Sequence, residues 1–304
     1  MNYYDEIKNE LINNEVYKKV KDYSKNRNDL ITYYNVGKLL IEAQGGEEKS
    51  EYGNKLIKEY SEKLTMELGK GYSKRNLYNM RLFYIKFCNQ DIVQAVPAIL
   101  TWSHILEILN IDDKNKINYY IGITAQYNLS YRELHTKIKN NEYERLDIET
   151  KNKMIKQEKQ EIKDFIKHPI LIRNSYNYNE VSEKVLKQLI LEDISSFMKE
   201  LGDGYTYVDN EYKIKIGERY NFIDLLLYNI KFNCYIVIEL KVTELKSEYI
   251  GQIQKYINYI DKNIKTINQD KTIGIIICKK DNMFLMEYCT DDRIYRTTYE
   301  LINI

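Results

Sequence analysis

The spacing of hydrophobic residues divides the chain into a helical first half and a second half that contains strands. From about residue 205 onward, apolar residues alternate with polar ones or run continuously, which is typical of strands. In the first half they recur every three or four positions, as in Leu30, Ile31, Tyr34, Leu39 and Leu40. This pattern predicts an all-α region over residues 1 to about 145, followed by an α/β domain.

Capping residues locate two helix starts in the first half. Ser73 follows a glycine-rich turn and offers an N-cap for a helix that runs to about Phe87. Ser130, with a glutamate three residues later, forms a capping box for a helix that runs to about Lys139. We therefore expect well-defined helix boundaries at both places.

The second half predicts a helix, a meander of strands, a second helix and a final pair of strands. The helices are expected over residues 181–201 and 248–261. The strands are expected over residues 205–208, 211–216, 221–228, 234–242, 272–278 and 283–289, with the last two paired as a hairpin. This order predicts an α/β sandwich around a mixed sheet.

A charged segment separates the two halves. Residues 147–168 begin with a helix-prone run rich in Lys, Glu and Gln. We place the domain boundary there: a helical domain over residues 1–146, a charged helical linker over residues 147–168, and the α/β domain over residues 169–304.

Composition and charge exclude several classes of protein. The chain has 304 residues, 43% of them hydrophobic and 30% charged, which is typical of a globular protein and long enough for two cores. The net charge of +1 means that any binding to nucleic acid must depend on a local basic patch. No apolar run approaches the roughly 20 residues that span a bilayer. We expect a soluble, cytoplasmic protein with reduced cysteines and no membrane partner.

Two neighbouring predicted strands carry three charged side chains within apolar sequence. Because side chains alternate along a strand, Glu239 and Lys241 lie on the same face. A tight hairpin centred on residues 231–232 would pair Asp224 with Glu239, with Cβ atoms roughly 4.5–5.5 Å apart. A cation between two such carboxylates relieves both their repulsion and their desolvation, and Mg²⁺ prefers oxygen ligands of this kind. We interpret these residues as a metal site for the hydrolysis of phosphodiesters.

The same residues resemble a known catalytic motif. Asp224 followed by Glu239-Leu240-Lys241 resembles the motif of the PD-(D/E)XK nucleases, with Ile223 in the place of the proline. On the helix that follows, Gln252 and Tyr256 resemble the Gln-x-x-x-Tyr element of the RecB-like branch of these nucleases.

The resemblance extends over almost the whole chain. Residues 239–252 and 272–279 are similar to the C-terminal domain of the YhcG-type family of PD-(D/E)XK nucleases. Residues 33–38, 71–84 and 101–104 are similar to the helical N-terminal domain of that family. The resemblance implies a winged-helix-like all-α domain, followed by a restriction-endonuclease-like α/β domain with a central mixed sheet.

The resemblance also implies a metal cofactor, Mg²⁺, for which Mn²⁺ can substitute. Asp224 and Glu239, helped by the Leu240 carbonyl, would hold the metal. Lys241 would orient a water molecule or help to deprotonate it, and would offset the charge that builds on the phosphate.

Further catalytic candidates lie on the flanking helices. Glu192 is the candidate for an outer acidic residue that supports a metal or Lys241, with Asp193 and Glu183 as alternatives. Gln252 would position water or a phosphate, whereas Tyr256 is expected to brace its helix.

A basic segment in the first half is a second candidate site. From Gly69 to Gln90 there is no Asp or Glu, and a glycine-rich turn, a serine cap and a basic helix resemble the second helix of a helix-turn-helix. The segment that follows Ser130 repeats this pattern faintly. Lysine and arginine would contact phosphates, and asparagine could reach base edges. The alternative is a solvated basic helix in a protein–protein platform. The predicted nucleic-acid-binding residues are Lys70, Lys74, Arg75, Asn76, Arg81 and Arg132.

Together these features predict a Mg²⁺-dependent nuclease whose partner is nucleic acid, with DNA as the expected substrate. Two alternatives stay open. One is a non-cleaving nucleic-acid-binding or adaptor protein that retains the nuclease fold, and the other is a structure-specific nuclease for branched or modified DNA. Double-strand cutting with one site per chain would favour a homodimer. The sequence does not decide between endonuclease and exonuclease activity, or between DNA and RNA.

Overall fold

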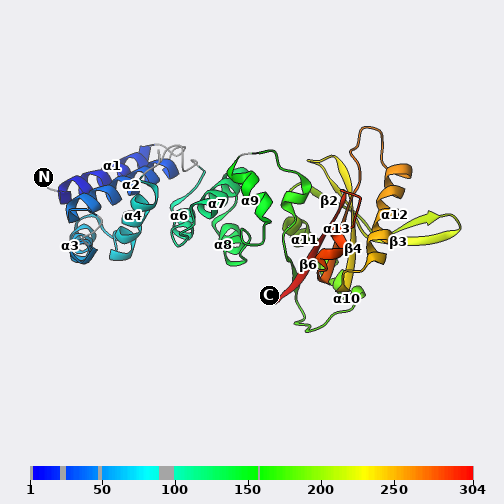
Figure 1. Cartoon of the computed structure of the whole chain (residues 1–304). Coiled ribbons are helices and arrows are strands. Elements are labelled where there is room, and N and C mark those ends of the chain that lie inside the picture. The colour runs from blue at the N-terminus through cyan, green and yellow to red at the C-terminus, as the bar shows by residue number, and fades with distance from the viewer. Residues whose placement is uncertain (1–2, 21–24, 47–49, 89–98, 157, 304) are drawn as a thin grey trace. The chain divides into compact units, whose positions relative to one another are not determined.

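The computed structural model describes residues 3–20, 25–46, 50–88, 99–156 and 158–303. The chain divides into two compact units, Met1–Tyr143 and Glu144–Ile304, and each is considered by itself (Figure 1). The part of the basic segment beyond residue 88 lies outside the described residues.

In the first unit, every regular element within the described ranges is a helix. Strands that could form a wing are therefore not among the described residues, and the winged-helix form is not confirmed. The helices are α1 (Tyr3–Val20), α2 (Lys25–Gln44), α3 (Ser50–Leu68), α4 (Lys74–Phe87), α6 (Trp102–Ile108), α7 (Lys114–Tyr127) and α8 (Tyr131–Lys139).

Both helix starts predicted from capping residues are confirmed. The Ser73 side chain accepts a hydrogen bond from the backbone N–H of Asn76 and caps α4. Ser130 and Glu133 form the reciprocal capping box that begins α8. Close packing of α2 against α4 depends on Gly37, because a Cβ atom there would lie 2.1 Å from the Met80 carbonyl oxygen.

The second unit is a six-stranded mixed sheet covered by helices. Its helices are α9 (Ile148–Ile155), the 3₁₀ helix η2 (Ile162–Phe165), α10 (Glu183–Glu192), α11 (Ile194–Leu201), α12 (Ser247–Asn263) and α13 (Met283–Glu287). Its strands are β1 (Ile170–Asn174), β2 (Tyr205–Ile216), β3 (Arg219–Asn229), β4 (Cys234–Glu244), β5 (Ile273–Lys280) and β6 (Ile294–Asn303). The strand order is β1-β6-β5-β4-β3-β2, with antiparallel pairing from β2 to β4 and parallel pairing from β4 to β1.

Alternation along β4 divides the core of this unit between the two faces of the sheet. Ile236, Ile238 and Leu240 pack with α10 and α11 on one face. Val237 packs with α12 on the other face. Because side chains alternate, Glu239 follows Val237 onto the α12 face.

The predicted 283–289 strand is wrong, since these residues begin with α13. The strand beside β5 is instead β6, and it runs parallel to β5. A parallel neighbour requires a crossover connection and cannot be reached through a tight hairpin. The predicted helix over residues 181–201 is divided at Asp193, whose carboxylate accepts a hydrogen bond from the Ser196 amide and starts a new helix.

The segment expected to be a charged linker contributes to the second unit. Ile162 and Ile166 are buried in the core beneath α10 and α11. Asp164 is also buried, and its carboxylate accepts hydrogen bonds from Thr150 and Lys153. Residues before 169 therefore belong structurally to the α/β unit.

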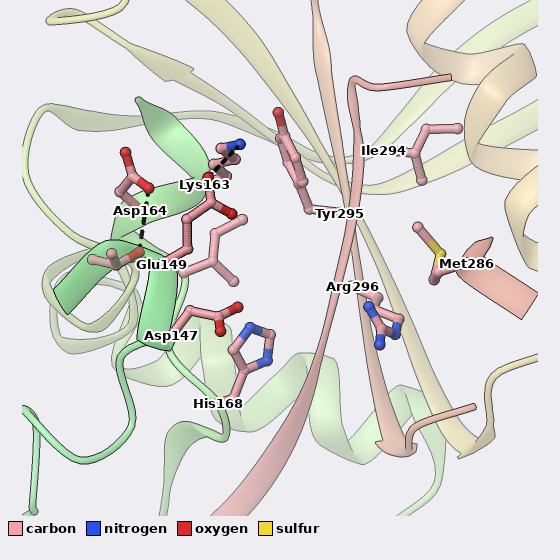
Figure 2. A pocket seen from close by; sticks show the side chains of 11 residues that line it. Asp147, Glu149, Lys163, Asp164, His168, Met286, Ile294, Tyr295 and Arg296 are labelled. Atoms are coloured by element: carbon pink, nitrogen blue, oxygen red, sulfur yellow. Dashed lines mark hydrogen bonds and ion pairs between the residues drawn. The ribbon is translucent and has the colours of Figure 1, made fainter. Parts of the chain in front are cut away.

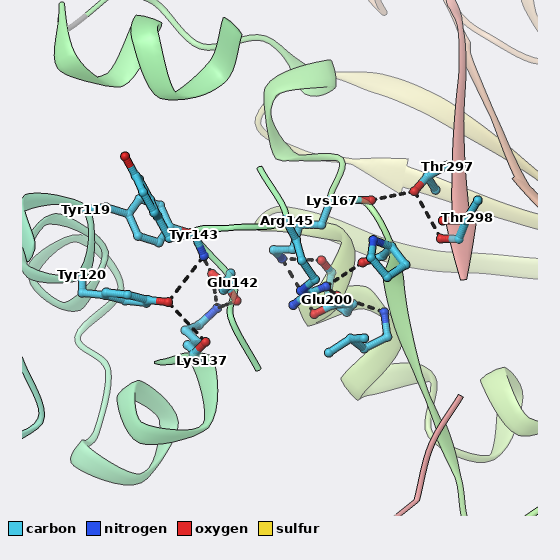
Figure 3. A network of polar contacts seen from close by, with 12 residues as sticks. Tyr119, Tyr120, Lys137, Glu142, Tyr143, Arg145, Lys167, Glu200, Thr297 and Thr298 are labelled. Atoms are coloured by element: carbon cyan, nitrogen blue, oxygen red, sulfur yellow. Dashed lines mark hydrogen bonds and ion pairs between the residues drawn. The ribbon is translucent and has the colours of Figure 1, made fainter. Parts of the chain in front are cut away.

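Polar networks hold the last residues of the first unit and, separately, the first residues of the second unit (Figure 3). In the first unit, Tyr119 and Lys137 both donate hydrogen bonds to the carboxylate of Glu142. In the second unit, Arg145 is buried and forms an ion pair with Glu200 of α11. The first network joins Glu142 to α7 and α8, and the second joins Arg145 to α11, so each network lies within its own unit.

Candidate active site

The hairpin of β3 and β4 has the register that the sequence predicts. The two strands pair from Asn229 opposite Cys234 to Leu225 opposite Ile238, which confirms a hairpin centred on residues 231–232. Continuing this register by one residue sets Asp224 opposite Glu239. The ladder ends at Leu225, so Asp224 lies at the point where β3 and β4 begin to separate.

Asp224 connects three elements at this point. Its Oδ2 accepts a hydrogen bond of 3.0 Å from the Leu240 backbone amide of β4. Its Oδ1 accepts a hydrogen bond of 2.9 Å from the ammonium group of Lys187, which belongs to α10 and also pairs with Glu211. The Asp224 carboxylate, and not a β3 carbonyl, therefore accepts the hydrogen bond from the Leu240 amide, and the Lys187 ammonium group lies beside it.

Glu239 is a buried carboxylate with one oxygen left unbonded. Its side chain is 2% exposed, and its Oε1 lies 2.8 Å from the Lys241 ammonium group and accepts a 2.8 Å hydrogen bond from Gln252. Its buried Oε2 has no hydrogen-bond partner among the described residues. Burial, together with the negative charge of Asp224, raises the pKa of Glu239 to about 7 despite the neighbouring lysine.

Lys241 is held as a cation inside the site. Its ammonium group lies 2.8 Å from Glu239 and 3.5 Å from the Glu183 carboxylate, and 5.1 Å from the centre of the Tyr249 ring. Burial alone would lower the pKa of Lys241, but the carboxylates around it outweigh burial and raise that pKa. Of its two predicted roles, this favours orientation and charge stabilisation over removal of a proton from water.

The structure does not bring Glu192 to the acidic pair. Its carboxylate accepts a hydrogen bond from the Tyr176 hydroxyl. Glu183 lies nine residues earlier on α10, roughly 13 Å along the helix, and contacts Lys241. Asp193, the other alternative, caps α11. The structure therefore favours Glu183, one of the two alternatives, over Glu192 as the outer acidic residue.

Gln252 lies in the site and binds Glu239 directly. Besides its bond to Glu239, its side-chain amide donates a 3.0 Å hydrogen bond to the Tyr256 hydroxyl. Tyr256 is 3% exposed and packs in the core under α12. This chain of contacts holds the Glu239 carboxylate in place, and the positioning of water or a phosphate by Gln252 stays a prediction.

Lys187 is the site residue that the sequence analysis missed. It lies on α10, four residues after Glu183, and its side chain is 15% exposed beside Asp224. Two contacts to carboxylates raise its pKa, even though burial acts in the opposite direction. An isolated lysine in a helix is common, and no sequence signal distinguished this one.

The donor set fits a hard divalent cation. Mg²⁺ is usually bound by one or two carboxylates together with water and substrate oxygens. Asp224 and Glu239 supply two carboxylates, and the unbonded Oε2 of Glu239 is an acceptor that a cation would satisfy. Within the described ranges, no three His, Cys, Asp or Glu side chains gather into a larger metal site. The carbonyl of Leu240 stays a predicted ligand.

The predicted nucleic-acid contacts on the first unit fall into two groups. Asn76 is engaged in the fold, because its side chain accepts a hydrogen bond from the Trp102 indole and donates one to the Gly71 carbonyl. Arg81 is only 8% exposed. The fold engages or buries both side chains, and their role in binding nucleic acid stays a prediction. The exposed predicted residues are Lys70, Lys74, Arg75 and Arg132.

A separate pocket of the second unit contains none of the predicted site residues (Figure 2). His168, Asp147 and Arg296 are among the residues that line it. Burial lowers the pKa of His168, although the charge of Asp147 opposes this. Arg296 already pairs with Asp281, and we assign this pocket no catalytic role.

Comparison with known proteins identifies the family. Residues 159–302 match the family described as the YhcG PDDEXK nuclease domain, and residues 9–145 match the DUF1016 N-terminal domain. A curated relative from Escherichia coli (strain K12), "Putative nuclease YhcG", is 26% identical over 287 residues, which covers 81% of this chain and 76% of the relative. The chain belongs to the YhcG-type PD-(D/E)XK nuclease family, which confirms the resemblance seen in the sequence.

Two solved structures show weaker likeness. One is a repair endonuclease from Pyrococcus abyssi, with 16% identity over 40% of this chain and 48% of the other, at a TM-score of 0.29. The second is EndoMS in its dsDNA2 complex, with 18% identity over 43% of this chain and 48% of the other, also at 0.29. This chain therefore spans about half the length of each of these two proteins. A TM-score of 0.29 is too low to assign this chain any property of either one. Among the helices described here, none is long and apolar enough to span a membrane.

Proposed function

We propose that this protein is a Mg²⁺-dependent nuclease that hydrolyses phosphodiester bonds in DNA. The observation that carries the proposal is the buried carboxylate of Glu239, which has one oxygen without a hydrogen-bond partner among the described residues and a pKa that the charge of Asp224 helps to raise. Leaving a buried carboxylate oxygen without a partner is costly, and a cation bound at Oε2 would remove that cost. Membership of a nuclease family supports the same reaction class.

Asp224 and Glu239, with the Leu240 carbonyl, would hold the metal. When bound there, Mg²⁺ would polarise the scissile phosphate and lower the pKa of a coordinated water. The contact from Gln252 occupies Oε1 of Glu239 and leaves Oε2 available.

The two lysines supply positive charge at the place where negative charge develops. Lys241 stays protonated, so it can stabilise a phosphate that gains charge in the transition state and orient the attacking water. Glu183 and the ring of Tyr249 hold its ammonium group in position. Lys187 keeps a second cation beside Asp224.

The proposal extends to the partner and the cellular setting. The exposed basic residues of the helical unit, Lys70, Lys74, Arg75 and Arg132, would contact DNA phosphates. The four cysteines are unpaired, which fits a reducing cytoplasm. A homodimer would allow both strands to be cut by one site per chain.

The direct experiment is a cleavage assay with plasmid, linear duplex and single-stranded DNA, and with RNA of the same sequence. We expect cleavage of DNA in Mg²⁺, loss of cleavage in EDTA, and recovery when Mn²⁺ is added. Cleavage that is unaffected by the chelator would contradict metal dependence. Tight binding without turnover under any divalent cation would indicate a non-cleaving nucleic-acid-binding protein instead.

A further inference from the structure

The outer part of the β2–β3 hairpin forms a two-stranded arm. The β3 ladder with β4 stops at Leu225, whereas the ladder with β2 continues to Ile216 opposite Arg219. In Figure 1 this yellow-green ribbon extends beyond α12. Within the part of the chain that the structure describes, residues 212–222 therefore have a strand neighbour on one side only.

The two faces of this arm differ sharply. Ile214 and Ile223 are 1% and 0% exposed and pack in the core under α12. On the opposite face, Tyr220 and Phe222 are 56% and 48% exposed. Single exposed apolar residues are common, but two aromatic rings on one face of a short arm are not explained by the fold.

Lysine side chains lie among these rings. Lys213 is paired with Phe222 across the ladder, and Lys215 is paired with Tyr220. The Lys213 ammonium group lies 3.9 Å from the centre of the Tyr220 ring, which is a cation–π distance. Directly opposed residues share one face, so the four side chains form a single surface, named here the arm platform: Lys213, Lys215, Tyr220 and Phe222.

The charge of the arm favours a polyanion as its partner. Residues 212–222 contain three cations, Lys213, Lys215 and Arg219, and one carboxylate, Glu218. A second copy of the same arm would bring like charges together, which is unfavourable. Exposed aromatic rings interleaved with cations are the chemistry that binds unpaired nucleotides, because bases stack on the rings and phosphates meet the cations. In a duplex, the faces of the bases are already covered by their neighbours.

The arm platform also lies close to Asp224 along β3. Phe222 and Tyr220 precede Asp224 by two and four residues, which corresponds to about 7 and 13 Å of extended strand. We infer that the arm platform binds unpaired nucleotides beside the scissile phosphate. On this basis, which rests on the proposed nuclease function, the substrate class is nucleic acid with a single-stranded segment next to the bond that is cut.

The test is binding of a fluorescein-labelled single-stranded DNA and of the matching blunt duplex, measured by fluorescence anisotropy in EDTA. The double variant Tyr220→Ala/Phe222→Ala should bind the single strand at least about tenfold more weakly, given the contribution of stacking for each base. Its affinity for the duplex should change by less than about threefold, because the duplex gains little from stacking on these rings. The matched control is Phe284→Ala/Tyr288→Ala, which removes two exposed rings elsewhere in the same unit and should bind as wild type does.

Rescue separates stacking from misfolding. Tyr220→Phe/Phe222→Tyr keeps both rings and should restore binding of the single strand. Wild-type affinity in the alanine variant would overturn the inference, as would an equal loss for single strand and duplex. A change in oligomeric state on gel filtration with unchanged DNA binding would also overturn it, and would assign the arm to self-association.

Because EDTA prevents metal-dependent cleavage, this experiment is independent of turnover. Selective loss of single-strand binding in a protein that never cleaves would support the arm platform and reject the proposed nuclease. Normal cleavage by the wild type, combined with unchanged single-strand binding in the alanine variant, would support the proposed nuclease and reject the arm platform.

Discussion

Glu239→Gln is expected to lower the rate of DNA cleavage by about a thousandfold or more. The substitution keeps the shape of the side chain but replaces the buried carboxylate that would bind the metal with a neutral amide. Metal-ion stabilisation contributes several kcal/mol, and each 1.36 kcal/mol corresponds to a factor of ten in rate. Initial rates in Mg²⁺ measure the effect, with circular dichroism to verify folding.

The matched control is Glu192→Gln. It makes the same chemical change on α10, where the carboxylate contacts Tyr176 and does not contact the acidic pair. Its cleavage rate should equal that of the wild type. If both variants cleave equally well, Glu239 has no part in catalysis.

In the absence of divalent cations, the stability of the protein is expected to fall as pH rises from about 4.5 to about 7. The pKa of Glu239 is about 7 in the folded protein and 4.5 for the reference carboxyl group. Between these values the folded state binds more protons than the unfolded state, so stability decreases with increasing pH. A difference of this size corresponds to about 3 kcal/mol, at 1.36 kcal/mol for each pH unit.

Urea unfolding in EDTA across this range measures the effect. Other carboxyl groups also titrate there, so the comparison is with Glu239→Gln, which should lack this part of the pH dependence. Added Mg²⁺ should stabilise the wild type more at high pH than at low pH, because it binds the ionised carboxylate. Parallel pH profiles for the wild type and the variant would contradict the raised pKa.

The acidic pair could be predicted from the sequence because its geometry is local. Asp224 and Glu239 lie on consecutive strands joined by a short turn, and side-chain alternation with turn length fixes which residues face each other. Capping is equally local, and it correctly gave the starts of α4 and α8.

Contacts between distant segments could not be predicted in the same way. β6 lies beside β5 through a parallel crossover, and no short-range pattern specifies such a pairing. The choice between Glu183 and Glu192 depends on how α10 packs on the sheet, and the position of Lys187 depends on the same packing.

The basic segment of the first unit shows a further limit. Composition identified a run without carboxylates, but it could not show that Arg81 is buried or that Asn76 is bonded to Trp102. When cationic residues lie on more than one side of a helix, the side that faces solvent depends on which elements pack against it, and the sequence of the helix alone does not specify them.

The most direct test of the central claim, a divalent ion held jointly by Asp224 and Glu239, is a Mn²⁺ titration followed by electron paramagnetic resonance. Wild type and Glu192→Gln should bind Mn²⁺ with equal affinity, and both Asp224→Asn and Glu239→Gln should bind it at least about tenfold more weakly, as expected when a charged ligand is lost. Equal Mn²⁺ affinity in all four proteins would contradict a shared metal site.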